Sequence, residues 1–215
     1  MASTRSIVDL THKLRSGAPT YPGDPPVEFH AHGRLEEVGY NITQVMFGVH
    51  SGTHLDVPCH CLVDGCTVEC LDLDKCIGTA HIVHLDDKGP GSSITLDDLE
   101  ADAAWFTPGA RILLHTGWSE RYGKEEFYQD FPAIEPEAAR WMVERGIVLL
   151  GIEQPSVHPE KHKEVHKIIL GSEIVLVESM AHLDKIERDD FRLIVLPMNL
   201  DVLDGSPVRA VAVEE

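Results

Sequence analysis

The feature that most constrains this chain is a short stretch rich in metal-binding side chains. It runs from His50 to Cys61 and reads His-Ser-Gly-Thr-His-Leu-Asp-Val-Pro-Cys-His-Cys. Three imidazoles and one carboxylate within eleven positions are donors that zinc and manganese accept. We therefore predict a metal site here. The alternative is a polar surface loop with scattered histidines.

The spacing of the first two histidines requires the backbone to turn. In a straight strand that rises about 3.3 Å per residue, His50 and His54 would lie about 13 Å apart. Two ligands of one ion each lie only about 2.1 Å from it, so an extended chain cannot bring both to the same ion. Gly52 lies between them and permits the backbone angles of such a turn.

The same stretch predicts a local conformation. We expect a strand to end near Val49 and a tight or single-helical turn to carry the first two histidines and Asp56. Pro58 stops a helix from continuing, so an extended exit to His60 is expected.

The pattern His-x-Gly-Thr-His-x-Asp-x-Pro-x-His resembles the signature of the metal-dependent cyclase family, which includes bacterial kynurenine formamidases and isatin hydrolases. Every fixed position is filled, by His50, Gly52, Thr53, His54, Asp56, Pro58 and His60. We expect His50, His54 and Asp56 to hold zinc or manganese with an open coordination position. His60 lies four residues beyond Asp56, and an imidazole at this position suits a general base that need not ligate the metal.

Length and composition limit the classes of protein that remain. The 215 residues fit one domain, for which we take residues 1–215. The net charge of −18 argues against nucleic acid and anionic membranes as partners. The sequence has no apolar run of membrane-spanning length and no signal-peptide core, so a cytoplasmic location is expected. The five cysteines match neither zinc-ribbon nor disulfide spacing, which favours reduced and mostly buried thiols.

Hydrophobic patterns predict an α/β protein. A helix begins at Thr95 with Asp98 three residues later, and a second has Pro136 in its first turn and Gly146 as its C-terminal cap. A third helix is expected over 161–170. Strands are expected over 6–11, 27–30, 41–49, 78–85, 111–116, 147–152, 173–178 and 191–197. The resemblance implies a mixed, barrel-like central sheet with flanking helices, of the swivelling β/β/α type.

A second group of candidate ligands lies in the last third of the chain. Glu178 ends an apolar run, where a carboxylate is costly to bury unless it meets a cation or a hydrogen-bond partner. The resemblance places a glutamate twelve residues after a histidine, which fits His166 and Glu178. It implies that these two residues bind a second metal, with Asp56 bridging the ions. His158 and His162 compete for the histidine role.

Other segments extend the resemblance over nearly the whole chain. The closing Gly-Ser-Pro-Val-Arg segment ends at Arg209, and the family likeness implies that Tyr21 and Trp118 lie against substrate. For Trp118, simple core packing is an equal alternative. Three residues depart from the usual family pattern: Glu153, His158 and His182.

The expected function is hydrolysis of an amide-type bond in a small aromatic substrate, in the manner of an arylformamidase acting on N-formylkynurenine. An isatin hydrolase, a lactone hydrolase and a dehydrating cyclase are alternatives on the same site. A non-catalytic metal-binding protein is the alternative of another class. The resemblance also implies one or two ions per subunit, a homodimer or homotetramer, and a pocket that a neighbouring subunit completes.

Overall fold

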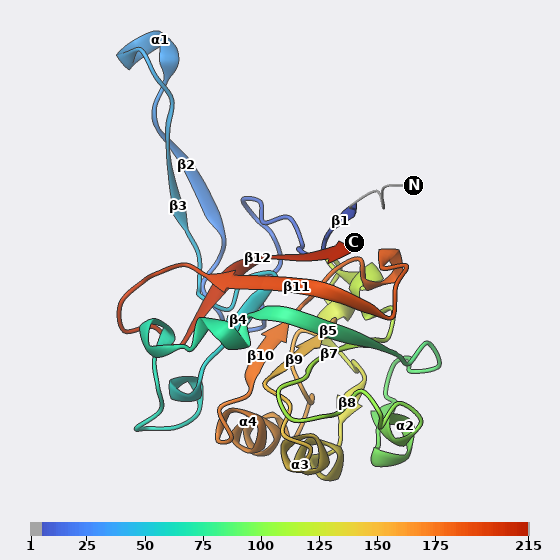
Figure 1. Ribbon diagram of the computed structural model, residues 1–215. Helices are drawn as coiled ribbons and strands as arrows, with labels where there is room; N and C mark the ends of the chain where they lie inside the picture. Colours follow the sequence, from blue (N-terminus) through green and yellow to red (C-terminus); the bar gives the residue numbers. More distant parts are fainter. Residues whose placement is uncertain (1–5, 215) are drawn as a thin grey trace, which may run out of the picture.

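The computed structural model describes residues 6–214 and is built around a sheet that closes on itself (Figure 1). Seven strands form the closed ring in the order β4, β10, β9, β7, β5, β11 and β12, and β12 pairs again with β4. Their bounds are His54–Asp56 (β4), Val175–Glu178 (β10), Leu149–Ile152 (β9), Arg111–His115 (β7), Ile77–His84 (β5), Asp190–Pro197 (β11) and Gly205–Glu214 (β12).

The ring contains both parallel and antiparallel pairs. Strands β5, β7, β9 and β10 run parallel, whereas β11, β12 and β4 join them through antiparallel pairs. Strand β1 (Ser6–Asp9) extends the sheet along the far end of β12. The mixed, barrel-like sheet with flanking helices confirms the expected fold class.

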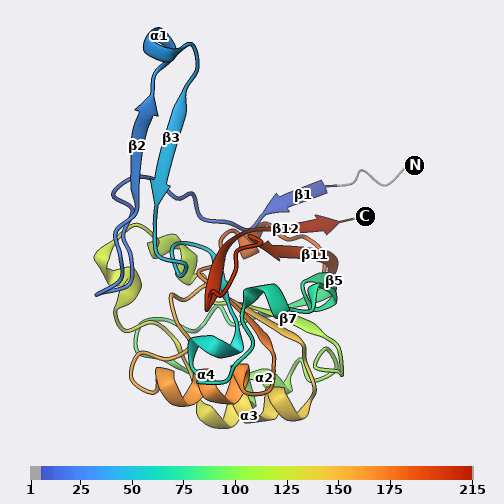
Figure 2. The same cartoon turned by 90° about the vertical axis from the view of Figure 1, so that its left-hand side faces the viewer.

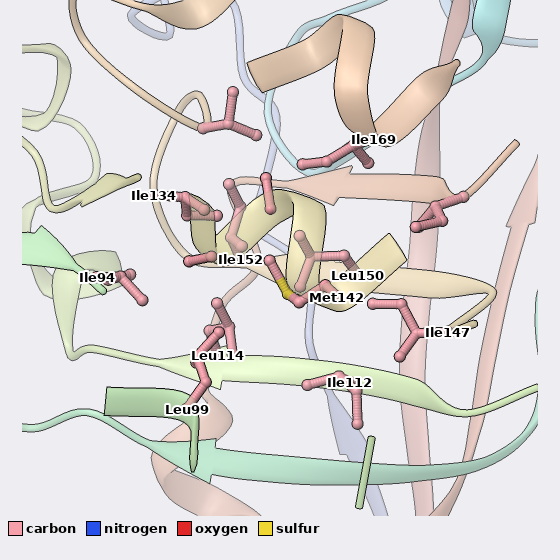
Figure 3. Close-up of a cluster of buried hydrophobic side chains, with 14 of the residues drawn as sticks. Ile94, Leu99, Ile112, Leu114, Ile134, Met142, Ile147, Leu150, Ile152 and Ile169 are labelled. Carbon is pink, nitrogen blue, oxygen red and sulfur yellow. The ribbon is translucent and has the colours of Figure 1, made fainter. Parts of the chain in front are cut away.

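Alternation along the parallel strands separates two apolar cores. Leu113 lies in the cluster inside the barrel, whereas its neighbours Ile112 and Leu114 belong to the cluster outside it. This follows from the two-residue period of a strand, in which successive side chains point to opposite faces. Met142 of α3 and Ile169 of α4 cover the outer cluster, as Figure 3 shows.

The helices pack against the parallel half of the barrel. They are α2 (Leu96–Glu100), α3 (Pro136–Glu144) and α4 (His162–Leu170), and they lie together below the sheet in Figure 1. The expected helix starts are confirmed: Asp98 accepts a hydrogen bond from the Thr95 amide at 2.7 Å, and Pro136 is the first residue of α3. Two short strands, β6 (Ser93–Ile94) and β8 (Ala133–Ile134), pair beside these helices.

An arm projects from the body of the molecule. It consists of β2 (Glu28–Gly33), α1 (Leu35–Val38) and β3 (Ile42–Met46), and both views show it standing clear of the barrel (Figures 1 and 2). Its apolar side chains are exposed, among them Tyr40, Val45 and Met46. The two strands were expected, with slightly different bounds.

The predicted conformation of the histidine-rich stretch is wrong in part. Strand β3 ends at Met46 rather than near Val49, and His54 and Asp56 lie on strand β4 rather than in a turn. The exit to His60 is a short 3-10 helix, Pro58–His60, rather than extended chain. Long-range pairing of β4 with both β10 and β12 causes the difference, because it holds as a strand a segment that local spacing predicts as a turn.

Two further expectations concern the cysteines and the membrane. All five cysteines are free, as expected, but only Cys76 is buried, so the expectation of mostly buried thiols is wrong. Within residues 6–214, no helix combines the length and the apolar character that crossing a bilayer requires.

Candidate metal centre

Strand β4 places two candidate ligands on one face. His54 and Asp56 are two residues apart and so share a side of the strand, while Leu55 between them points into the barrel core. In the pairing register, Glu178 of β10 lies opposite His54. The strand pairing thus brings together residues 124 positions apart in the sequence. The side chain of Glu178 points to the same face of β10 as that of Leu176, which belongs to the apolar cluster under the helices.

The approach of His50 to this face depends on two glycines. Gly52 has a φ of 65°, and a Cβ at this position would lie 2.7 Å from the Leu14 side chain. A Cβ on Gly205 of β12 would lie 2.7 Å from the His50 ring. The expected turn between His50 and His54 is therefore present, and a side chain at either glycine would displace its neighbours.

Each of three histidines has one ring nitrogen held by an acceptor. Nδ1 of His54 lies 2.8 Å from the Gly52 carbonyl, and Nδ1 of His166 lies 2.8 Å from the carbonyl at the start of α4. Nε2 of His50 lies 2.8 Å from Oδ2 of Asp204. An N–H donated to each acceptor fixes the orientation of the ring and presents the other nitrogen to the carboxylates, where a metal can displace its proton, which is how metal-ligating histidines are oriented in proteins.

The free nitrogens converge on two buried carboxylates. Oδ1 of Asp56 lies 2.8 Å from Nδ1 of His50 and 3.5 Å from Nε2 of His54. Nε2 of His166 lies 3.5 Å from Oδ2 of Asp56 and 3.4 Å from Oε1 of Glu178. Oε2 of Glu178 lies 3.5 Å from Nε2 of His54. Such separations match neighbouring ligands of one ion, each about 2.0–2.2 Å from it.

Two oxygen atoms of this cluster have no hydrogen-bond partner. They are Oδ2 of Asp56 and Oε1 of Glu178, on side chains that are only 1% and 4% exposed. A buried carboxylate without a partner is costly, and a divalent cation removes that cost. The donor set of imidazoles and carboxylates therefore fits zinc or manganese.

The electrostatics of the cluster favour positive charge. Burial lowers the pKa of His50, but the hydrogen bonds and negative charges of Asp56 and Asp204 outweigh it and raise that pKa to about 10. Burial also acts against the charged form of His166, yet Asp56 and Glu178 raise its pKa well above the usual range. The two buried carboxylates thus create a site that attracts cations.

His60 lies at the edge of this cluster, and its side chain is 30% exposed. Its ring centre is 4.3 Å from that of His50 and 5.4 Å from that of His166. Nδ1 of His60 lies 3.4 Å from Oδ2 of Asp204, the oxygen that also accepts from His50. Asp204 was not assigned a role from the sequence; its position directly before the closing Gly-Ser-Pro segment was the available signal.

The competing histidines have other neighbours. Nδ1 of His158 accepts hydrogen bonds from the amides of Glu160 and Lys161, which fixes the turn before α4. His162 lines the cavity, but its ring is not among those that contact the two carboxylates. Of the three candidates, His166 is the one that reaches both Asp56 and Glu178.

A cavity of about 530 Å³ lies over the cluster. Its walls include the candidate ligands together with Tyr21, Pro155, Lys163 and Lys167. Tyr21 lines the cavity, and its role as a substrate contact stays a prediction. Trp118 does not line this cavity; it is 2% exposed and packs with Phe127 and Phe131. Its assignment as a substrate contact stays a prediction.

The three departures from the family pattern lie outside the cavity wall. Glu153 is fully buried and accepts hydrogen bonds from the amides of Thr116 and Gly117, so it fixes the loop after β7. His182 is exposed with a φ of 58°. Asn and His are both enriched in this left-handed conformation, which explains why either can occupy the position.

Sequence comparison assigns the chain to a family. Residues 8–159 match the sequence profile of the family described as "Putative cyclase". The kynurenine formamidase of Geobacillus thermodenitrificans is 34% identical over 208 residues, which cover 94% of this chain and 95% of that enzyme. The kynurenine formamidase of Bacillus cereus is 34% identical over 213 residues, which cover 97% of each chain. The protein belongs to the cyclase family.

Solved structures share the fold. An isatin hydrolase bound to the product analogue thioisatinate matches with a TM-score of 0.87 at 23% identity, covering 98% of this chain and 92% of that one. Isatin hydrolase A from Ralstonia solanacearum matches with a TM-score of 0.89 at 21% identity and the same coverage. At these identities the likeness establishes the fold alone.

Proposed function

We propose that this protein is a metal-dependent hydrolase that cleaves an amide-type bond in a small aromatic substrate, as an arylformamidase does. The observation that carries the proposal is the arrangement of His50, His54 and His166. Each has one nitrogen held by an acceptor and the other directed at the buried carboxylates. The identity to kynurenine formamidases over nearly the full length supports the substrate class.

Two ions per subunit fit the donors. His50, His54 and one oxygen of Asp56 would hold the first ion, and His166 with the other oxygen of Asp56 would hold the second. The oxygens of Glu178 lie one beside His54 and one beside His166, so this residue serves both positions. A bound zinc or manganese ion would supply water acidified to a pKa of about 7 and would polarise the substrate carbonyl.

His60 is the residue that we expect to move protons. Because its Nδ1 faces Asp204, its Nε2 is the nitrogen that takes a proton from the attacking water. The same nitrogen then delivers the proton to the leaving amine, so that a formamide and water give formate and the free amine. Asp204 holds the tautomer and orientation of His60, which is a positioning role.

The cavity supports a small substrate with a negative charge. Its volume of about 530 Å³ falls within the range of sites for small molecules. Tyr21 offers an aromatic surface, and burial, together with the charges of Glu178 and Asp24, raises the pKa of its hydroxyl, so the ring stays neutral. Lys163 and Lys167 bring positive charge to the wall, which suits a carboxylate on the substrate.

The test is hydrolysis by protein loaded separately with zinc and with manganese. We expect release of formate from N-formylkynurenine, and loss of this activity in Asp56→Asn. Asp64→Asn, which removes an acidic group that does not line the cavity, is the matched control and should retain it. Absence of turnover of N-formylkynurenine, isatin and a simple lactone with both metals would favour the non-catalytic metal-binding alternative.

Isatin hydrolysis is the second candidate function. The fold match to an isatin hydrolase bound to a product analogue supports this candidate, because a cyclic amide presents the same kind of carbonyl carbon to an activated water. The relative rates on N-formylkynurenine and isatin separate the two. A dehydrating cyclase or lactone hydrolase would be favoured instead if both amides were left intact while a lactone was opened or formed.

We also propose that the chain forms a homodimer or homotetramer through the projecting arm. The exposed apolar side chains of Val45 and Met46, on opposite faces of β3, support this, because exposed apolar surface marks sites of association. Val45→Lys combined with Met46→Lys should reduce the mass measured by light scattering to that of one chain. An unchanged mass would exclude the arm as the contact. The cytoplasmic location and the lack of nucleic-acid or membrane partners stay predictions from composition.

A further inference from the structure

A second cluster of metal-binding side chains lies away from the central cavity. His84 and His115 are the last residues of β5 and β7, two parallel strands that pair in register, so the histidines are direct neighbours. Asp86 follows two residues after His84. One ligand atom from each of the three residues lies within 4.8 Å of the other two.

Nδ1 of His115 lies close to a ligand atom of each of the other two residues. Nδ1 of His115 lies 3.3 Å from Nδ1 of His84 and 3.2 Å from Oδ1 of Asp86. Two ligands each about 2.1 Å from an ion and separated by these distances subtend about 100° at the ion, which is close to tetrahedral geometry. The backbone register alone thus places two imidazoles at the spacing that a zinc-class ion requires.

Hydrogen bonding accounts for this arrangement less well than a cation does. Nδ1 of His115 carries either one proton or one lone pair, yet it faces both His84 and Asp86. If its N–H points to Asp86, the nitrogen of His84 has no separate partner in the cluster. If Nδ1 of His115 instead accepts a hydrogen bond from His84, its lone pair faces the carboxylate oxygen of Asp86, and that contact is repulsive. A divalent ion gives all three ligand atoms a favourable partner.

The cluster opens onto a cavity of its own. This cavity has a volume of about 560 Å³, and its wall includes Asp86 and His115 together with Thr116, Gly117 and Trp118. It shares no lining residue with the central cavity. Three protein ligands would leave one tetrahedral position for water.

We propose that His84, Asp86 and His115 bind a divalent ion of the zinc class at a second, peripheral site. The ion ties the ends of β5 and β7 to the segment that carries Asp86. His115 leads directly into the loop whose amides donate to Glu153, so the ion also restrains this loop.

Zinc binding to the whole protein tests the proposal. Wild type and His84→Ala are equilibrated with buffered free zinc, and bound zinc per chain is measured by elemental analysis across a range of free concentrations. We expect His84→Ala to bind one zinc ion fewer than wild type. Asp86→Asn should lower the affinity for the most weakly bound zinc ion, the one at the peripheral site, at least about tenfold. His32→Ala removes an exposed imidazole from the arm and is the matched control, which should bind as wild type does.

Turnover of the same samples shows which site has lost the ion. His84→Ala should keep the activity of wild type, because the central ligands are intact. The proposal is overturned if His84→Ala and Asp86→Asn bind as much zinc as wild type, or if His32→Ala loses as much as they do. It is also overturned if the loss of zinc is accompanied by an equal loss of activity, since the missing ion would then be a central one.

Discussion

The central and peripheral histidine clusters combine the same side chains in different surroundings. In the central cluster, Asp56 and Glu178 are almost fully buried, and three histidines have their second nitrogen held by an acceptor. In the peripheral cluster, His115 is nearly buried, but His84 is exposed and the Asp86 side chain is 70% exposed. Water can solvate the peripheral carboxylate, whereas the central carboxylates depend on a cation.

This difference predicts how strongly each cluster holds an ion and what the ion contributes. Ligands that are fixed before binding lose little conformational freedom when the ion arrives, so the central site should bind more tightly. The exposed side chains of the peripheral cluster lose more conformational freedom on binding an ion, and water competes with the ion for them. The variants below test this contrast, beginning with the largest expected effect.

Removing a buried ligand should have the largest effect. In His54→Ala, two carboxylates lose a shared neighbour, and we expect loss of bound metal by elemental analysis. Activity should fall by at least about 10³-fold, which corresponds to roughly 4 kcal/mol of transition-state stabilisation. His84→Ala in the peripheral cluster should keep its activity. Full metal content and full activity in His54→Ala would show that the central cluster does not depend on this ligand, which contradicts the proposed difference between the two clusters.

Removing the base should separate binding from chemistry. His60→Ala leaves the three fixed histidines and both carboxylates in place, so we expect an unchanged metal content. Turnover should fall by about 10²–10⁴-fold, the usual contribution of a general acid–base residue. A loss of metal equal to that in His54→Ala would instead make His60 a ligand, as its spacing to His50 and Asp56 allows.

His12 extends the comparison, because its ring is half-buried and, within residues 6–214, pairs with no carboxylate. Burial, with a smaller effect of the charge on His182, lowers its pKa to about 4, and its ring stacks on Tyr122 with centres 3.7 Å apart. Between pH 6.5 and 4, the unfolded chain therefore binds more protons than the folded protein does. The contribution of His12 to stability is complete above pH 6.5 and falls by up to about 3 kcal/mol as the pH approaches 4.

His12→Phe keeps an aromatic ring beside Tyr122 but cannot take a proton. The free energy of unfolding of this variant, measured with urea at several pH values, should therefore decrease less on acidification than that of wild type. His32→Ala is the control for removal of a solvated histidine and should follow the wild-type curve. An identical pH dependence in wild type and His12→Phe would show that folding does not favour the neutral form of His12.

The smallest effect is expected from the residue that supports two histidines at once. Asp204→Asn keeps the shape of the side chain but weakens its hydrogen bonds to His50 and His60. We expect a decrease of about 10- to 100-fold in metal affinity or activity, as is usual for residues that orient metal ligands. A change in kcat with unchanged metal affinity would show that Asp204 acts mainly by orienting His60. Wild-type kcat and wild-type metal affinity would show that Asp204 orients neither histidine.

The accuracy of the sequence-based predictions differed with the range of the interactions involved. Helix starts at Thr95 and Pro136 were predicted correctly, because capping and the proline ring act within one turn. The family resemblance, with its glutamate twelve residues after a histidine, implied the pair of His166 and Glu178, and the structure brings these two residues together. The strand conformation of His54 was missed, because it depends on pairing with β10 and β12 rather than on neighbouring residues.

The sequence by itself determined the types of donor, their clustering between His50 and His60, and the apolar segments that form the barrel. Only the tertiary structure decided that His166 rather than His158 faces Asp56, that Asp204 supports His50 and His60, and that His84 lies against His115. The physical reason is the closure of the sheet. Strand register sets which distant side chains share a face, and no local pattern of residues specifies that register.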